Sequence, residues 1–271
     1  MKQRILTAVI LIPLLLAVLY ALPKIVTVLL FCLLCAIAAY ELLYGTGLVR
    51  HGRMVAYAMV FAFAVPIWCW LGRNTVAANV ALLVFFCLLF MEMMLSGMRI
   101  GFDRCAMTLA AGLLLPYMLS SISRILTPEG GRYVVLVPFV AAFLSDSGAY
   151  FIGCRFGKHK LAPVISPKKS VEGVFGGILF ATIGMLGYCA VMHYGFGCTV
   201  NYGYALVYGI LGSLAGVFGD LCFSVIKRQT GIKDYGNLMP GHGGVLDRFD
   251  SMIVVGPLVE LLLIFMPVVV K

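Results

Sequence analysis

The chain has 271 residues, of which 62% are hydrophobic and 11% are charged, and its mean hydropathy is +1.05. A soluble domain carries about 45–50% apolar and about 25% charged residues, so this composition excludes an ordinary soluble enzyme, a disordered chain and a small secreted protein. The formal net charge of +9 fits the basic cytoplasmic loops of a membrane protein, and no nucleic-acid partner is expected.

Apolar runs follow one another along the chain, each close to the roughly 20 residues that cross about 30 Å of hydrocarbon. Backbone in lipid must satisfy its own hydrogen bonds, so runs of this length are predicted to be helices. The predicted spans are 5–22, 24–44, 54–71, 75–95, 105–126, 133–154, 173–194, 203–226 and 252–270. The expected fold class is therefore all-α, a polytopic integral membrane protein with about nine transmembrane helices.

Lysine and arginine determine the predicted orientation, because these residues gather on the cytoplasmic side of membrane proteins. With the N-terminus inside, most of the 20 basic residues also fall inside. The inside set is Lys2, Arg4, Arg50, Arg53, Arg99, Arg104, Arg155, Lys158, Lys160, Lys168, Lys169, Lys227, Arg228, Lys233 and Arg248. The outside set is Lys24, Arg73, Arg124, Arg132 and Lys271. The sequence therefore predicts nine spans with the N-terminus in and the C-terminus out.

Two predicted cytoplasmic connections, 155–172 and 227–251, are long, polar and rich in both charge signs. Acids inside a membrane are costly and by default indicate function. Each acid alone would also suit a packing role or an ion pair, but several beside basic loops favour a site. The acids in or beside the two connections are Asp146, Glu172, Asp220, Asp234, Asp247 and Asp250. The others, Glu41, Glu92, Asp103, Glu129 and Glu260, are expected to be structural.

The residue types around the second connection suit a metal and a nucleotide. Asp220, Lys227 and Arg228 lie near one helix face because they are seven and eight positions apart. Asp247 and Asp250, three apart, also share a face. Mg²⁺ takes one or two carboxylates plus substrate phosphates, and lysine and arginine suit the remaining phosphate charge. Glycines let backbone N–H groups approach an anion; here they are Gly236, Gly241, Gly243 and Gly244.

The first connection carries Ser166, Lys168, Lys169 and Ser170 just before an apolar span. One interpretation is a phosphate or nucleotide clamp. The other is a basic anchor at the bilayer surface, with Ser170 capping the following helix. Composition alone leaves both open. The GxxxxGK[ST] and GxGxxG patterns are absent from the sequence, so P-loop and Rossmann chemistry have no support.

These residues resemble the signature of the CDP-diacylglycerol synthase (phosphatidate cytidylyltransferase) family. The matching positions read Ser224-x-x-Lys227-Arg228-x4-Lys233-Asp234-x-Gly236-x3-Pro240-x-His242-Gly243-Gly244-x-x-Asp247-Arg248-x-Asp250. Two further stretches resemble the family: Ser166 to Ser170 followed by Glu172-Gly173, and Asp146 to Tyr150 followed by Gly153 and Phe156-Gly157. The resemblance covers about 140–255, whereas 1–130 match only as generic spans. The departures, Met239 and Ser170, affect no ligand position.

The resemblance implies that CTP and phosphatidate react to give CDP-diacylglycerol and pyrophosphate. It also implies Mg²⁺, a second monovalent cation such as K⁺, and a homodimer. We expect a bacterial inner-membrane enzyme of phospholipid biosynthesis whose active site faces the cytoplasm. In that arrangement 1–130 would form a transmembrane scaffold with dimer contacts, and 131–271 the catalytic region.

Under this reaction, Asp220 and Asp247 are assigned to the metal, with Asp250 as a third or outer ligand. The catalytic residues are expected to be Asp220, Lys227, Arg228, Asp247 and Arg248. The substrate-binding residues are expected to be Ser166, Lys168, Lys169, Ser170, Lys233, His242, Gly243, Gly244 and Asp146. Two roles stay open: Asp146 either binds metal or anchors a lysine, and His242 either orients the loop or contacts phosphate.

Other functions are also open from the sequence. A related cytidylyltransferase could act on another lipid phosphate, because the sequence does not reveal the lipid tail. His242 and Asp247 have the H-x4-D spacing of glycerolipid acyltransferases, in which the histidine is the base, but that leaves Asp220 and Lys227 unexplained. A transporter would need buried ionisable residues along a path, whereas these acids gather at one predicted membrane face.

Overall fold

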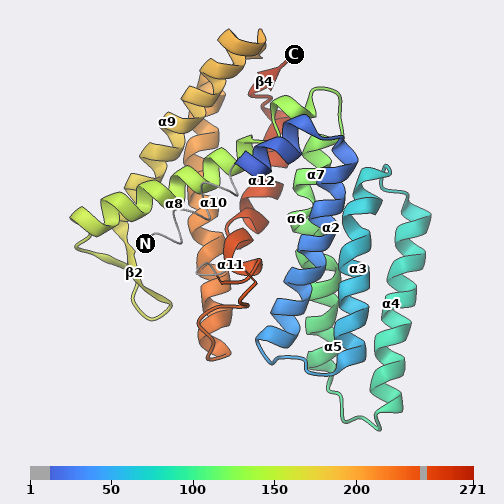
Figure 1. Ribbon diagram of the computed structural model, residues 1–271. Coiled ribbons are helices and arrows are strands. Elements are labelled where there is room, and N and C mark those ends of the chain that lie inside the picture. The colour runs from blue at the N-terminus through green and yellow to red at the C-terminus, as the bar shows by residue number, and fades with distance from the viewer. Residues whose placement is uncertain (1–12, 239–242) are drawn as a thin grey trace. The chain divides into compact units, whose positions relative to one another are not determined.

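The computed structural model describes residues 13–238 and 243–271, which form two compact units (Figure 1). The first unit comprises Met1–Thr127 and Thr230–Arg248, and the second comprises Pro128–Gln229 and Phe249–Lys271. Within the described ranges, 7 helical segments are long and apolar enough to cross a membrane. The expectation of a helical, polytopic membrane protein is confirmed at this level.

The long segments coincide with the predicted runs in the middle of the chain. They are Lys24–Gly45, Gly52–Trp70, Thr75–Leu95, Phe102–Leu126, Gly131–Phe156, Val171–Phe196 and Tyr202–Gln229. Of the first predicted run, the structure describes the part from residue 13, which includes the π-helical turn η1 (Ala17–Ala21). The last predicted run forms α12 (Met252–Phe265), whose 14 residues rise about 21 Å. This helix ends there because Met266 precedes a proline, Pro267, and its backbone (φ −139°, ψ 68°) is no longer helical.

The first unit is a helical bundle in which α3 packs against α2, α4 and η3, and Figure 1 shows α2, α3 and α4 side by side. Its core includes Phe31, Met54 and Phe85, all fully buried, and the Phe85 ring stacks on Phe61 at 4.2 Å between centroids. Its elements after η1 are α2 (Lys24–Tyr40), the π-turn η2 (Glu41–Gly45), α3 (Gly52–Trp70), α4 (Thr75–Leu95), α5 (Phe102–Leu109), the π-turn η3 (Ala110–Leu114), α6 (Leu115–Leu119) and α7 (Ser121–Leu126). The short α11 (Leu246–Phe249) begins in this unit.

In the second unit α9 packs against both α8 and α10, and α12 packs against α10 and α8. One close approach of α8 and α9 is at Gly148, where a Cβ would lie 2.5 Å from the carbonyl oxygen of Gly176 and 2.6 Å from the Cβ of Phe180. A larger residue at Gly148 would therefore force the two helices apart. The elements are η4 (Gly131–Tyr133), α8 (Val137–Phe156), α9 (Val171–Phe196), α10 (Tyr202–Gln229) and α12.

Two short antiparallel sheets depart from the all-α expectation. In the connection predicted as a loop, β1 (Lys160–Ala162) pairs with β2 (Ser166–Ser170). Pro163 ends β1 because proline cannot donate to a ladder, and the turn that follows returns the chain along β2. The second sheet pairs β3 (Thr199–Val200) with β4 (Val269–Val270), which follows α12.

Candidate functional site

The Ser-Pro-Lys-Lys-Ser stretch and the eighth predicted span meet in the second unit. The Nζ atom of Lys169 on β2 lies 2.6 Å from Oδ2 of Asp220 on α10, and each side chain is about a quarter exposed. Oδ1 of the same aspartate accepts a hydrogen bond from Ser224 Oγ at 3.0 Å. Two segments about 50 residues apart in the sequence are thus joined by a partly buried ion pair.

The same hairpin is fixed at both of its ends. Nε of Arg228 on α10 donates to the carbonyl oxygen of Ile165 in the hairpin turn at 3.0 Å. At the base, the Glu172 carboxylate accepts from the backbone N–H groups of Lys158 and His159, and its Oε1 lies 2.6 Å from His159 Nδ1. These contacts hold the hairpin against α10, so that Lys169 on β2 faces Asp220.

Ser170 caps helix α9. Its side chain is buried, and Oγ accepts a hydrogen bond from the backbone N–H of Gly173 at 3.2 Å. Of the two interpretations of this stretch, capping is therefore confirmed for Ser170, while its part in substrate binding stays a prediction. Ser166 is half-buried on β2 and Lys168 is exposed.

Acidic charge is concentrated around Asp250, which lies between α11 and α12. Burial raises the pKa of the Asp250 carboxyl to about 7, with further contributions from the negative charges of Asp220 and Asp146 and opposition from Lys227. The approach is close because Gly219, next to Asp220 on α10, lies against the Asp250 backbone. Such oxygen-rich, like-charged surroundings suit a divalent cation, although no three acid, histidine or cysteine side chains cluster tightly in the parts of the chain that the structure describes.

The other half of the signature belongs to the first unit, where Asp247 organises the loop. Its Oδ2 accepts hydrogen bonds from the backbone N–H groups of Tyr235 at 2.7 Å and Gly244 at 3.0 Å. Gly243 takes a φ of +81°, a left-handed conformation that favours glycine, and a Cβ there would approach Asp247 Oδ2. In the described contacts, Asp247 thus binds backbone amides of its own loop.

Sequence reasoning missed Glu41, which was expected to be merely structural. This carboxylate lies in η2 and is only 4% exposed. It accepts hydrogen bonds from the backbone N–H groups of Val245 at 3.0 Å and Leu246 at 2.7 Å, more than 200 residues away. A Cβ at Gly236 or Gly244 would lie 2.4 Å from Glu41 Oε1, so both glycines are needed for this approach. The available signal was an acid within an apolar run.

The predicted site residues divide between the two units. The second unit holds Asp146, Ser166, Lys168, Lys169, Ser170, Asp220, Lys227, Arg228 and Asp250. The first unit holds Lys233, Gly243, Gly244, Asp247 and Arg248, of which Lys233 and Arg248 are exposed. His242 lies outside the described residues. Within the second unit the structure brings Lys169 to Asp220 and Asp220 close to Asp250.

Comparison with known proteins gives the family. The sequence pattern described as the cytidylyltransferase family matches residues 2–266. The chain belongs to the cytidylyltransferase family. Curated relatives named phosphatidate cytidylyltransferase include those of Staphylococcus epidermidis, 48% identical over 136 residues (50% of both chains), and Staphylococcus haemolyticus, 44% identical over 140 residues (52% of both chains). That of Staphylococcus aureus is 42% identical over 138 residues, 51% of this chain and 52% of the relative.

The chain spans about half the length of the curated relatives it matches. These relatives and the family match confirm the resemblance to the CDP-diacylglycerol synthases that the motifs indicated. The shared family name supports transferase and nucleotidyltransferase chemistry.

Proposed function

We propose that this protein transfers the cytidylyl group of CTP to phosphatidate, forming CDP-diacylglycerol and pyrophosphate. Family membership supports the reaction class. The observation that carries the proposal in the structure is the 2.6 Å pair of Lys169 and Asp220, which joins the Ser166–Ser170 motif to α10, the helix on which the signature begins. The arrangement combines a cation for phosphate with acids for a metal, as nucleotidyl transfer requires.

The chain itself positions the reactants and neutralises charge. A phosphate monoester has its second pKa near 6, so phosphatidate is largely a dianion at pH 7 and needs no dedicated base. One of its oxygens forms a bond to the α-phosphorus of CTP. The bond from that phosphorus to the bridging oxygen breaks, and pyrophosphate leaves with the electron pair. Lys227 and Arg228, on α10 of the second unit, hold phosphate oxygens for the in-line reaction.

Mg²⁺ fits the acids of the second unit. Asp220 and Asp250 offer hard oxygen ligands, and Asp220 lies close enough for its negative charge to add to the effect of burial on the Asp250 pKa. When bound, the ion supplies charge neutralisation at the transferring phosphate. In this proposal Asp146 adds charge and K⁺ serves as a second cation, while Asp247 acts by holding the signature loop of the first unit.

We further propose nine spans with the N-terminus in and the C-terminus out, counting the first apolar run and α12 as spans. The site would then face the cytoplasm of a bacterial inner membrane, and the protein would be a homodimer. The basic residues on the predicted inner side support the orientation, and the staphylococcal relatives support a bacterial membrane.

The test uses purified protein in micelles containing phosphatidate, with CTP labelled at its α-phosphate and either Mg²⁺ or EDTA. We expect metal-dependent label in the lipid phase, and none with the folded Asp247→Asn variant. Glu129→Gln, at an exposed site outside the motifs, is the control and should keep activity. Transfer only to other lipid phosphates would change the proposed substrate. No transfer to any of them from well-folded protein would refute the proposal.

A further inference from the structure

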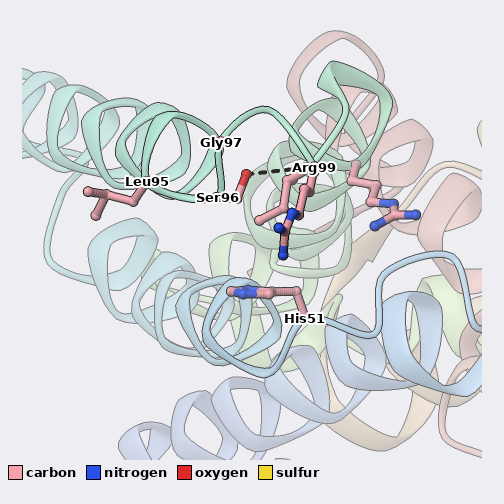
Figure 2. Close-up of a pocket in the computed structure, with 7 residues that line it drawn as sticks. His51, Leu95, Ser96, Gly97 and Arg99 are labelled. Carbon is pink, nitrogen blue, oxygen red and sulfur yellow. Dashed lines mark hydrogen bonds between the residues drawn. The ribbon is translucent and has the colours of Figure 1, made fainter.

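A basic pocket of about 660 Å³ lies in the first unit and contains none of the residues assigned to cytidylyl transfer. Its polar lining comes from His51, which precedes α3, from Ser96, which follows α4, and from Arg99 and Arg104. Figure 2 shows the Arg99 side chain extending toward the His51 ring. Three nitrogen-bearing side chains from two segments of the chain therefore face one cavity.

The cavity wall is held by its own hydrogen bonds. Ser96 Oγ donates to the carbonyl oxygen of Met93 at 2.7 Å and accepts from the backbone N–H of Ile100 at 3.2 Å, which fixes the turn that carries Arg99. Figure 2 marks the bond that reaches back to Ser96. The turn that carries Arg99 is thus held by the protein's own hydrogen bonds.

The polar groups that line this pocket are available to bind an anion. Within the described residues neither Arg99 nor Arg104 forms an ion pair, whereas Arg53 nearby pairs with Glu92 at 3.3 Å. Nδ1 of His51 is buried and has no hydrogen-bond partner among the described residues. A preference for basic residues on one membrane face explains why the two arginines are present, but it does not require them to line one pocket with an unsatisfied histidine nitrogen.

The surroundings of the pocket are apolar and exposed. Leu95, Met98 and Phe102 are 73%, 79% and 63% exposed, respectively. The pocket lies where the candidate spans of α3 and α4 end, so it is expected at the level of lipid headgroups. A ligand with a phosphate for the arginines and hydrocarbon for the exposed apolar side chains matches both features.

We propose that this pocket binds the phosphate of an anionic phospholipid, with its acyl chains along Leu95, Met98 and Phe102. The guanidinium groups of Arg99 and Arg104 donate to the phosphate oxygens, and His51 Nδ1 donates or accepts at the inner wall. The site is separate from the proposed reaction, so it does not depend on the catalytic assignment.

The experiment uses the full chain in micelles with phosphatidylglycerol that carries a diazirine in its acyl chain, and the matching phosphatidylcholine as a second probe. After photolysis, chymotryptic peptides covering 91–104 are measured by mass spectrometry. Arg99→Gln and Arg104→Gln are compared with Arg73→Gln, an exposed arginine in the turn that joins the opposite ends of α3 and α4. All three variants alter exposed side chains and are expected to fold.

We expect phosphatidylglycerol to label this segment more strongly than phosphatidylcholine. Each pocket variant should reduce labelling about fivefold, the effect of one basic residue near an anionic surface, while Arg73→Gln leaves it unchanged. Equal labelling by both lipids, or equal labelling of all variants, would overturn the proposal. If inorganic phosphate reduces the labelling more than chloride does at equal ionic strength, the site binds free phosphate and the proposal of a bound lipid is overturned.

Discussion

Glu41→Gln tests whether a residue far from the signature in sequence holds the signature loop in place. The wild-type carboxylate accepts the backbone N–H groups of Val245 and Leu246 with one oxygen each. Glutamine keeps the shape but replaces one acceptor oxygen with an NH₂ group, which cannot accept from a backbone N–H. Because Glu41 is 4% exposed, water has little access to replace the lost acceptor.

The expected size follows from the bonds that are lost. A hydrogen bond to a charged group contributes about 1.5–3 kcal/mol, and Glu41→Gln removes one such bond and the charge on the other. At about 1.4 kcal/mol per factor of ten, loop opening should become roughly ten to a hundred times more frequent. Turnover should fall as well, because the loop carries Asp247 and Arg248.

Hydrogen exchange of the peptide covering 243–251 measures this opening, since it contains both amides that Glu41 accepts. Glu92→Gln is the matched control. Glu92 is also buried in the first unit, but its partners are Tyr57 at 3.0 Å and Arg53 at 3.3 Å. Glu92→Gln should lower the stability of the protein without speeding hydrogen exchange of the Val245 and Leu246 amides. Unchanged protection in Glu41→Gln, or equal loss of protection in both variants, would refute this positioning role.

Further substitutions test the second unit. In thermal unfolding, Gly148→Ala should destabilise the protein by about 1–3 kcal/mol because the added methyl group overpacks the contact between α8 and α9. Gly187→Ala on α9 is the control: a Cβ there meets nothing within 4 Å, so this variant should be neutral or slightly stabilising. Lys169→Met and Asp220→Asn should each reduce turnover, and their double-mutant cycle should show a coupling of about 0.5–3 kcal/mol; additive effects would contradict the ion pair. Ser170→Ala should cost about 1 kcal/mol of stability with the KM for CTP unchanged, whereas a raised KM would give Ser170 a substrate contact.

The spans could be predicted because length and apolar composition constrain backbone in a membrane. That signal does not report where a helix stops. The last run has 19 apolar-rich positions, yet α12 ends at Phe265 because the following Pro267 excludes a helical conformation at Met266. The hairpin of β1 and β2 was missed for a similar reason, since β2 consists of four polar residues and a proline and has no alternating hydrophobic pattern.

The site was predicted as a set of residue types, and the structure supplies the pairings. Lys169 and Asp220 were each named from charge and position, but nothing in their spacing indicated that they pair. Glu41 was set aside because acids were judged by their neighbours in sequence. Its actual partners, Val245 and Leu246, are brought to it by folding, so only a contact between distant segments reveals its role.

The acids in and around the signature have different hydrogen-bond and charge partners, although they look alike in sequence. Asp247 accepts backbone N–H groups of its own loop, and Glu41, outside the signature, accepts those of Val245 and Leu246. Asp250 is buried, and this burial together with the negative charge of Asp220 raises its pKa to about 7. A bound cation should therefore affect the second unit most. We expect Mg²⁺ to protect amides around Asp250 from exchange, while Val245 and Leu246 keep their protection in EDTA.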